Sequence, residues 1–136
     1  MTSAEFRESL AGRITAEEAA ALRAGEGLYI SAFNRDVMLR LLESNAPEAG
    51  VLTEAGEVSE ESVRELTEDL EKYLAEYMAD HPEGHKWIII ACLYLTFAEG
   101  LPMHPQHAAK WQKTASGYVC PHKVEDSITC RYCVCR

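Results

Sequence analysis

The first 80 residues of this chain contain neither histidine nor cysteine. All five histidines and all five cysteines lie in the last 56 residues, histidine at positions 81, 85, 104, 107 and 122 and cysteine at positions 92, 120, 130, 133 and 135. Imidazole and thiolate are the side chains that suit zinc and iron. The first part of the chain is therefore expected to be a scaffold, and a site built on these ligands must lie in the last part.

Basic residues are also scarce. The chain has 13 lysines and arginines against 22 aspartates and glutamates, which gives a net charge of −9 at pH 7. The imbalance is concentrated in residues 1–80, with 18 acidic and 7 basic side chains, whereas residues 81–136 have 4 and 6. Nucleic-acid binding needs many cations to neutralise phosphates. RNA binding is therefore disfavoured, although the last part offers Lys110, Lys113, Lys123, Arg131 and Arg136.

No apolar run is long enough to cross a membrane. The longest, Trp87 to Phe97, is broken only by Thr96, and at about 1.5 Å per residue it would span roughly half of a bilayer core. The first residues lack the basic segment and apolar run of an export signal. We therefore expect a cytoplasmic protein without a membrane partner, whose reduced cysteines serve metal or redox chemistry instead of disulfides.

The fold class predicted from length and periodicity is all-α. A chain of 136 residues with 47% hydrophobic residues is expected to form one domain with one core. Capping residues, apolar periodicity and helix breakers predict five helices, at residues 3–12, 16–23, 28–43, 59–80 and 83–98. The last of these is apolar nearly all round, which predicts a central helix covered by the others.

Two helices have predicted buried faces. In the helix from Leu28, these residues are Ile30, Phe33, Val37 and Leu41; in the helix after Ser59, they are Val63, Leu66, Leu70, Tyr73, Tyr77 and Met78. After residue 99 the chain is expected to be irregular, apart from a short strand at Tyr118 and Val119. The prediction is thus a single domain, with a helical body in residues 1–99 and a metal-binding tail in residues 100–136.

The tail contains a metal-ligand pattern. Cys130 and Cys133 form a C-x2-C pair, a spacing that lets one tight turn direct two sulfurs at one ion. Cys120 lies ten positions earlier and supplies a third ligand. We favour His104 as the fourth, because it would connect the tail to the body, and the alternatives are His107, His122 and Cys135. A tail with so little apolar surface needs another source of stability, and structural zinc supplies on the order of 10 kcal/mol.

Other uses of these cysteines remain open. Zinc is the preferred metal for cysteine and histidine ligands. An iron–sulfur cluster would instead use Cys120, Cys130, Cys133 and Cys135. A redox dithiol at Cys130 and Cys133 ranks third, because such motifs start a helix in a βαβ unit, which is not predicted here. The remaining alternative is that these residues are unliganded reduced thiols.

The other cysteine and histidines have simpler interpretations. Cys92 lies in the central helix and is expected to be a small core residue. His81 and His85 are four residues apart and could share an ion, but Pro82 and Gly84 lie between them, and a solvated helix cap is the preferred interpretation. No phosphate-binding loop, nucleophile elbow or catalytic carboxylate pair is present. Whether the protein is an enzyme is thus left open, and no catalytic residue is predicted.

Three stretches of the tail carry a family resemblance. They are His104-Pro105, Gly117-Tyr118-Val119-Cys120-Pro121-His122-Lys123 and Thr129-Cys130-Arg131-Tyr132-Cys133. The tail resembles that of a family of uncharacterised proteins from methanogenic archaea, with His-Pro, Cys-Pro-Val-Lys-like and Cys-x-x-Cys elements. This chain has His122 where the family pattern has valine, which argues against His122 as a shared ligand. The resemblance covers about the last third and implies a cytoplasmic archaeal protein, with no particular reaction.

Two functions are compatible with these features. The first is a protein-interaction or assembly module whose structural zinc fixes the tail to the helical body, with another protein as its partner. The second is a metalloenzyme or an iron–sulfur redox protein, which the surplus of candidate ligands favours. The coordination sphere distinguishes them, since a structural zinc has four protein ligands and a catalytic zinc keeps an open position.

Overall fold

A computed structural model describes residues 2–43, 58–99, 112–114 and 117–119. The predicted all-α bundle is confirmed. Its α-helices are α1 (Ser3–Ala11), α2 (Ala16–Ala24), α3 (Ala32–Leu42), α5 (Glu60–Tyr77) and α6 (His85–Tyr94). A short 3-10 helix, η1 (Pro82–Gly84), precedes α6 and a π-helical turn, η2 (Leu95–Glu99), follows it. Strands β1 (Gln112–Thr114) and β2 (Gly117–Val119) form an antiparallel pair, which confirms the strand predicted at Tyr118 and Val119.

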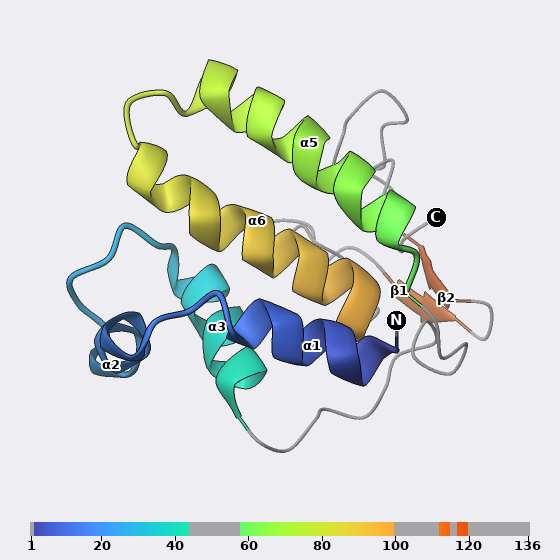
Figure 1. The fold of residues 1–136 in the computed structure, drawn as a ribbon, viewed down its shortest axis with the longest axis horizontal. Helices are drawn as coiled ribbons and strands as arrows, with labels where there is room; N and C mark the ends of the chain where they lie inside the picture. Colours follow the sequence, from blue (N-terminus) through green and yellow to red (C-terminus); the bar gives the residue numbers. More distant parts are fainter. Residues whose placement is uncertain (1, 44–57, 100–111, 115–116, 120–136) are drawn as a thin grey trace.

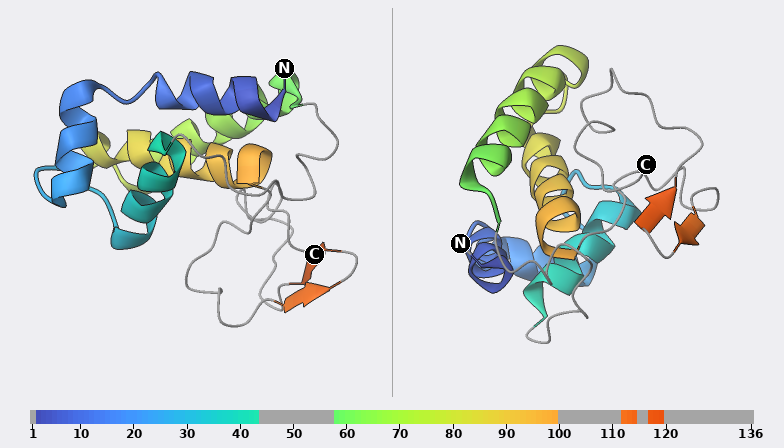
Figure 2. Two further views of the ribbon diagram at one scale, coloured as in Figure 1. Left: turned by 90° about the horizontal axis from the view of Figure 1, so that it is seen from below. Right: turned by 90° about the vertical axis from the view of Figure 1, so that its right-hand side faces the viewer.

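Helix α6 is the centre of the bundle, as predicted. It packs against α3, α5 and α1, and lies between α5 on one side and α1 and α3 on the other (Figures 1 and 2). Trp87, Ile90 and Leu93 are almost completely buried. Among the described helices, none is both long and apolar enough to span a bilayer. The division into a body of residues 1–99 and a tail of residues 100–136 stays a prediction, because most of the tail lies outside the described residues.

The first two helices begin with the predicted capping boxes. Thr2 Oγ1 accepts a hydrogen bond from the Glu5 N–H at 3.1 Å, and Glu5 Oε1 accepts one from the Thr2 N–H at 3.2 Å. Thr15 and Glu18 repeat this exchange at the start of α2. Each box satisfies backbone N–H groups that have no partner inside the helix. These local bonds explain why the starts of both helices could be predicted.

Helix α3 starts four residues later than predicted. It was expected from Leu28, but the structure has it from Ala32, with Ser31 Oγ accepting from the Asn34 N–H at 3.1 Å. Gly25 and Gly27 have φ angles of 76° and 87°, a left-handed conformation that glycine adopts at little cost. Gly25 is the C-cap residue of α2, and a non-helical segment from Leu28 to Ile30 precedes α3.

The buried face of α5 also differs from the prediction. Leu66, Leu70 and Leu74 are buried at steps of four, whereas Tyr73 and Tyr77 are 46% and 69% exposed. Two packed helices often interlock along rows of residues four apart, and such a row winds around the helix. Helix α5 contacts α6 along the row of Leu66, Leu70 and Leu74. The two tyrosines lie beside this contact and therefore stay exposed. Placing them in the core was therefore wrong, and Leu74 was missed.

Helices α5 and α6 run antiparallel and are joined by a tight turn (Figure 1). Helix α5 ends at Tyr77 instead of residue 80, and the predicted helix 83–98 is divided into η1, α6 and η2. Pro82 occupies the first position of η1, where its missing N–H and fixed φ are tolerated. Gly84 is buried in this turn. A Cβ atom there would lie 2.7 Å from both Met78 Cε and Tyr29 Cδ1, so any larger residue would force these side chains to shift.

Arg7 connects α1 to the end of α3. Its Nη2 donates to the Arg40 carbonyl oxygen at 3.2 Å and also to the Glu43 carbonyl oxygen. The last carbonyls of a helix have no partner inside it, and a cation near them also interacts favourably with the helix dipole. This contact bridges 33 residues of sequence and could not be read from local pattern.

Candidate functional site

The predicted metal ligands Cys120, Cys130, Cys133 and His104 lie outside the described residues, as do the alternatives His107, His122 and Cys135. The metal site therefore stays a prediction. Across residues 2–43, 58–99 and the two strands, no group of three histidines, cysteines or carboxylates is placed to hold a metal ion. The structure does show how the other three of the ten histidines and cysteines are used.

Cys92 and His85 have structural roles. Cys92 is buried in the core cluster around α6, with 8% of its surface exposed, which confirms the interpretation as a core residue. His85 Nε2 lies 2.7 Å from the Met78 carbonyl oxygen. A carbonyl only accepts, so Nε2 carries the proton and donates. Because that nitrogen is protonated, it is not free to bind a metal, and it ties the start of α6 to the end of α5.

His81 makes two contacts in the same turn. Its ring stacks on Tyr29 with 4.2 Å between the centroids and 9° between the planes. Its Nδ1 lies 3.2 Å from Glu83 Oε1. The Glu83 backbone N–H and the His81 ring together lower the pKa of the Glu83 carboxyl. His81 is the N-cap residue of η1, and its side chain makes no capping hydrogen bond. The stack itself was missed, because Tyr29 had been assigned to a helix and its 52-residue separation from His81 leaves no local signal.

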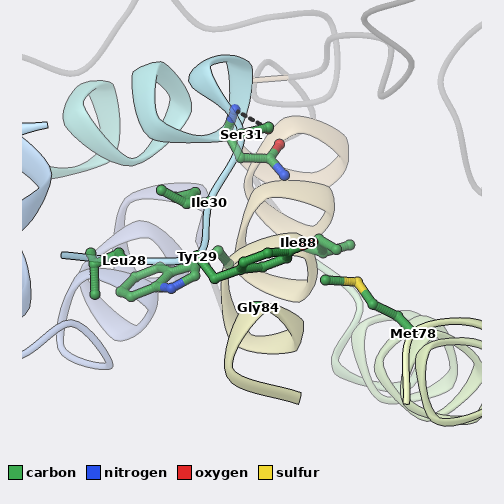
Figure 3. A pocket seen from close by; sticks show the side chains of 9 residues that line it. Leu28, Tyr29, Ile30, Ser31, Met78, Gly84 and Ile88 are labelled. Atoms are coloured by element: carbon green, nitrogen blue, oxygen red, sulfur yellow. Dashed lines mark hydrogen bonds between the residues drawn. The ribbon is translucent and has the colours of Figure 1, made fainter. Parts of the chain in front are cut away.

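A pocket of about 390 Å³ opens beside this stack. The segment Leu28–Ser31 forms one wall, and Met78 reaches toward it from the end of α5 (Figure 3). Its lining is mostly apolar, with Ser31 and Asn34 as the uncharged polar residues: Leu28, Tyr29, Ile30, Ser31, Asn34, Met78, Gly84, Trp87 and Ile88. Among the described residues that line it, none has a side chain that is charged at pH 7. This described lining therefore offers mainly apolar contact.

A second cavity of about 460 Å³ lies between the end of α2 and the start of α3. The charged residues lining it are Glu26 and Arg35. Arg35 Nη1 donates to the Leu22 carbonyl oxygen at 3.4 Å, near the end of α2. This bond gives Arg35 a backbone partner. The arrangement stabilises a helix end and does not resemble a catalytic pair.

Glu18 and Lys86 form an ion pair that links α2 to α6. Lys86 Nζ lies 2.7 Å from Glu18 Oε1 and 5.3 Å from the centroid of the Trp87 ring. Partial burial raises the pKa of the Glu18 carboxyl, but the hydrogen bonds from Lys86 and from the Thr15 N–H outweigh it, so the pKa lies below its ordinary value. Glu18 thus closes a capping box and holds a tertiary contact with the same oxygen.

Of the described helices, α5 carries the largest number of charged residues. The helix carries seven acidic and two basic residues, a balance of −5. Arg64 Nη1 and Glu68 Oε1 are 3.7 Å apart across one turn. The rings of Tyr73 and Tyr77 contact each other at 4.8 Å between centroids. Exposed aromatic rings of this kind are enriched at protein interfaces.

Comparison with known proteins gives a distant similarity. The chain is 28% identical over 88 residues to UPF0305 protein MJ0646 of Methanocaldococcus jannaschii, an alignment that covers 59% of this chain and 54% of that protein. The chain thus spans about half the length of the relative that it matches. This similarity supports a relation to an uncharacterised archaeal protein family. No family model matches the chain, and no solved structure matches it.

Proposed function

We propose that this protein is a small zinc-binding module for protein interaction or assembly, working in the cytoplasm. Cys120, Cys130, Cys133 and His104 would hold the zinc, which would supply the free energy that fixes residues 100–136 to the helical bundle. Three thiolates and one imidazole form a closed structural set, with no position left for substrate. The partner would be another protein, and the archaeal family relation would extend to the Cys-Pro and Cys-x-x-Cys elements of the tail.

One observation carries this proposal. Cys92, His81 and His85 are the cysteine and histidines of the described helical body, and each has a structural role there. The other seven cysteines and histidines all lie after residue 99. Ligands gathered in one segment can close around one ion, whereas the described residues of the bundle contain no group of three histidines, cysteines or carboxylates placed to hold a metal ion.

Elemental analysis of the untagged protein, purified without oxygen, tests the proposal. One zinc per chain is expected, and Cys130→Ser and Cys133→Ser should each lower the zinc content, because each removes a thiolate that coordinates the ion. Cys92→Ala is the matched control, because it removes a cysteine that lies in the core, and the zinc content should not change. Iron with sulfide would support the alternative iron–sulfur protein. Metal-free protein with freely reactive thiols would refute both.

A further inference from the structure

The solvent side of α5 carries a continuous row of residues four positions apart. It consists of Glu61, Glu65, Asp69, Tyr73 and Tyr77, and we call it the α5 ridge. Asp69 is partly buried and the other four residues are exposed. At every turn the ridge lies one position before the buried row of Leu66, Leu70 and Leu74, so it runs along the edge of the contact with α6. Helix α5 forms an outer edge of the bundle (Figure 2).

The two tyrosines are the apolar part of the ridge. They are 46% and 69% exposed and pack against each other. Tyrosine is enriched at protein interfaces, where a rigid ring gives a large contact area at a low entropic cost. The face of such a ring also attracts a cation, and a planar guanidinium stacks on it better than an ammonium does.

Charge selects the partner. The α5 helix has a balance of −5, and the whole chain has −9. Two copies of α5 facing each other would bring like charges together, and a nucleic acid or an anionic membrane would be repelled. We propose that the α5 ridge binds an arginine-bearing helical segment of another protein. Guanidinium groups would pair with Glu65 and stack on Tyr73 and Tyr77.

A row of residues four apart is inclined to the helix axis and winds around it. A straight partner helix with arginines four apart would therefore cross α5 at an angle and contact the middle of the ridge, around Glu65, Asp69 and Tyr73. This inference names the partner chemistry of the proposed interaction module and rests on that part of the proposed function. It does not depend on the zinc.

A fluorescein-labelled, alanine-based peptide of about 18 residues with arginine at every fourth position is a suitable probe. Fluorescence anisotropy with the full chain should show saturable binding that weakens as salt increases. Replacing the arginines of the probe by lysine should weaken binding severalfold. Tyr73→Ala combined with Tyr77→Ala should weaken it at least about tenfold, whereas the two Tyr→Phe changes keep the ring faces and should preserve it.

A matched charge control separates the ridge from general attraction. Glu65→Lys on the ridge and Glu17→Lys on α2 change the net charge equally, and both residues are exposed. Glu65→Lys should weaken binding at least about tenfold, and Glu17→Lys should change it less than about twofold. Equal effects of the two variants, absence of binding, or a dimer that forms through α5 would overturn the inference. Circular dichroism checks that each variant is folded.

The zinc proposal and the inference about the α5 ridge can be refuted separately. If Cys130→Ser protein loses its metal and still binds the probe, the two features are independent, as the inference requires. If zinc is present and the probe does not bind, the inference fails and the zinc proposal stands. If the probe binds to protein that never contains metal, the zinc proposal fails and the ridge stands.

Discussion

Replacing Glu18 with alanine is expected to remove two contacts at once. The carboxylate closes the capping box of α2 by accepting from the Thr15 N–H at 3.0 Å, and it accepts from Lys86 Nζ at 2.7 Å. The capping bond contributes about 1 kcal/mol. The ion pair contributes about 0.5 kcal/mol, because its side chains are 37% and 24% exposed and solvent screens them. The free energy of unfolding should therefore fall by about 1.5 kcal/mol, and the Tm by roughly 5 °C.

Urea unfolding followed by circular dichroism measures this change, and Glu5→Ala is the matched control. Glu5 closes the same type of box at α1, but within the described residues its side-chain bonds are local ones with Thr2. Glu5→Ala should therefore destabilise the protein less than Glu18→Ala. Glu18→Gln keeps a side chain that can close the box and removes the charge, so it should isolate the ion pair in a double-mutant cycle with Lys86→Met.

The difference in stability between wild type and Glu18→Gln should depend on pH with a definite sign. The pKa of Glu18 is lowered in the folded protein, so its contribution is fully present above the ordinary value of 4.5 and is lost as the pH falls through the lower folded value. Wild type should exceed Glu18→Gln in stability at neutral pH, and the two should converge in acid. Zero coupling between Glu18 and Lys86, or a difference that grows in acid, would refute the reasoning.

Two other substitutions test the packing of the bundle. Thr96 is 3% exposed and its Oγ1 has no hydrogen-bond partner among the described residues, so Thr96→Val, which keeps the shape, should raise the free energy of unfolding by about 1 kcal/mol; a fall would show that the hydroxyl has a partner. Gly84→Ala places a Cβ at 2.7 Å from Met78 Cε and Tyr29 Cδ1 and should cost about 1 kcal/mol. It should also shift the ring resonances of Tyr29 and His81 in NMR spectra, and unchanged resonances would contradict the packing described for that turn.

The parts of the fold that depend on local sequence were predictable. The pairs Thr2 with Glu5 and Thr15 with Glu18 define helix starts through bonds across three residues, so their signal lies within one turn. The apolar run around Trp87 is long enough to require burial on all sides, and it identified the central helix. Ser31 was an available capping signal for α3, but the apolar spacing that includes Ile30 outweighed it.

The parts that depend on how helices cross were not predictable. Leu74 is buried and Tyr77 is exposed because the contact between α5 and α6 follows one row of α5, and the sequence of α5 alone does not determine that row. The contact between Glu18 and Lys86 joins residues that are 68 positions apart. For the metal site, the sequence predicts Cys120, Cys130 and Cys133 as ligands but does not choose among His104, His107, His122 and Cys135 as the fourth.

X-ray absorption at the zinc edge of the purified protein tests the central claim most directly. Three sulfur atoms at about 2.3 Å and one nitrogen at about 2.0 Å are predicted around the zinc, as expected for three cysteines and one histidine in a closed site. His104→Ala should remove the nitrogen scatterer, and His107→Ala should leave it in place. A zinc with fewer protein ligands and a bound water, or a spectrum without zinc, would contradict the structural role proposed for it.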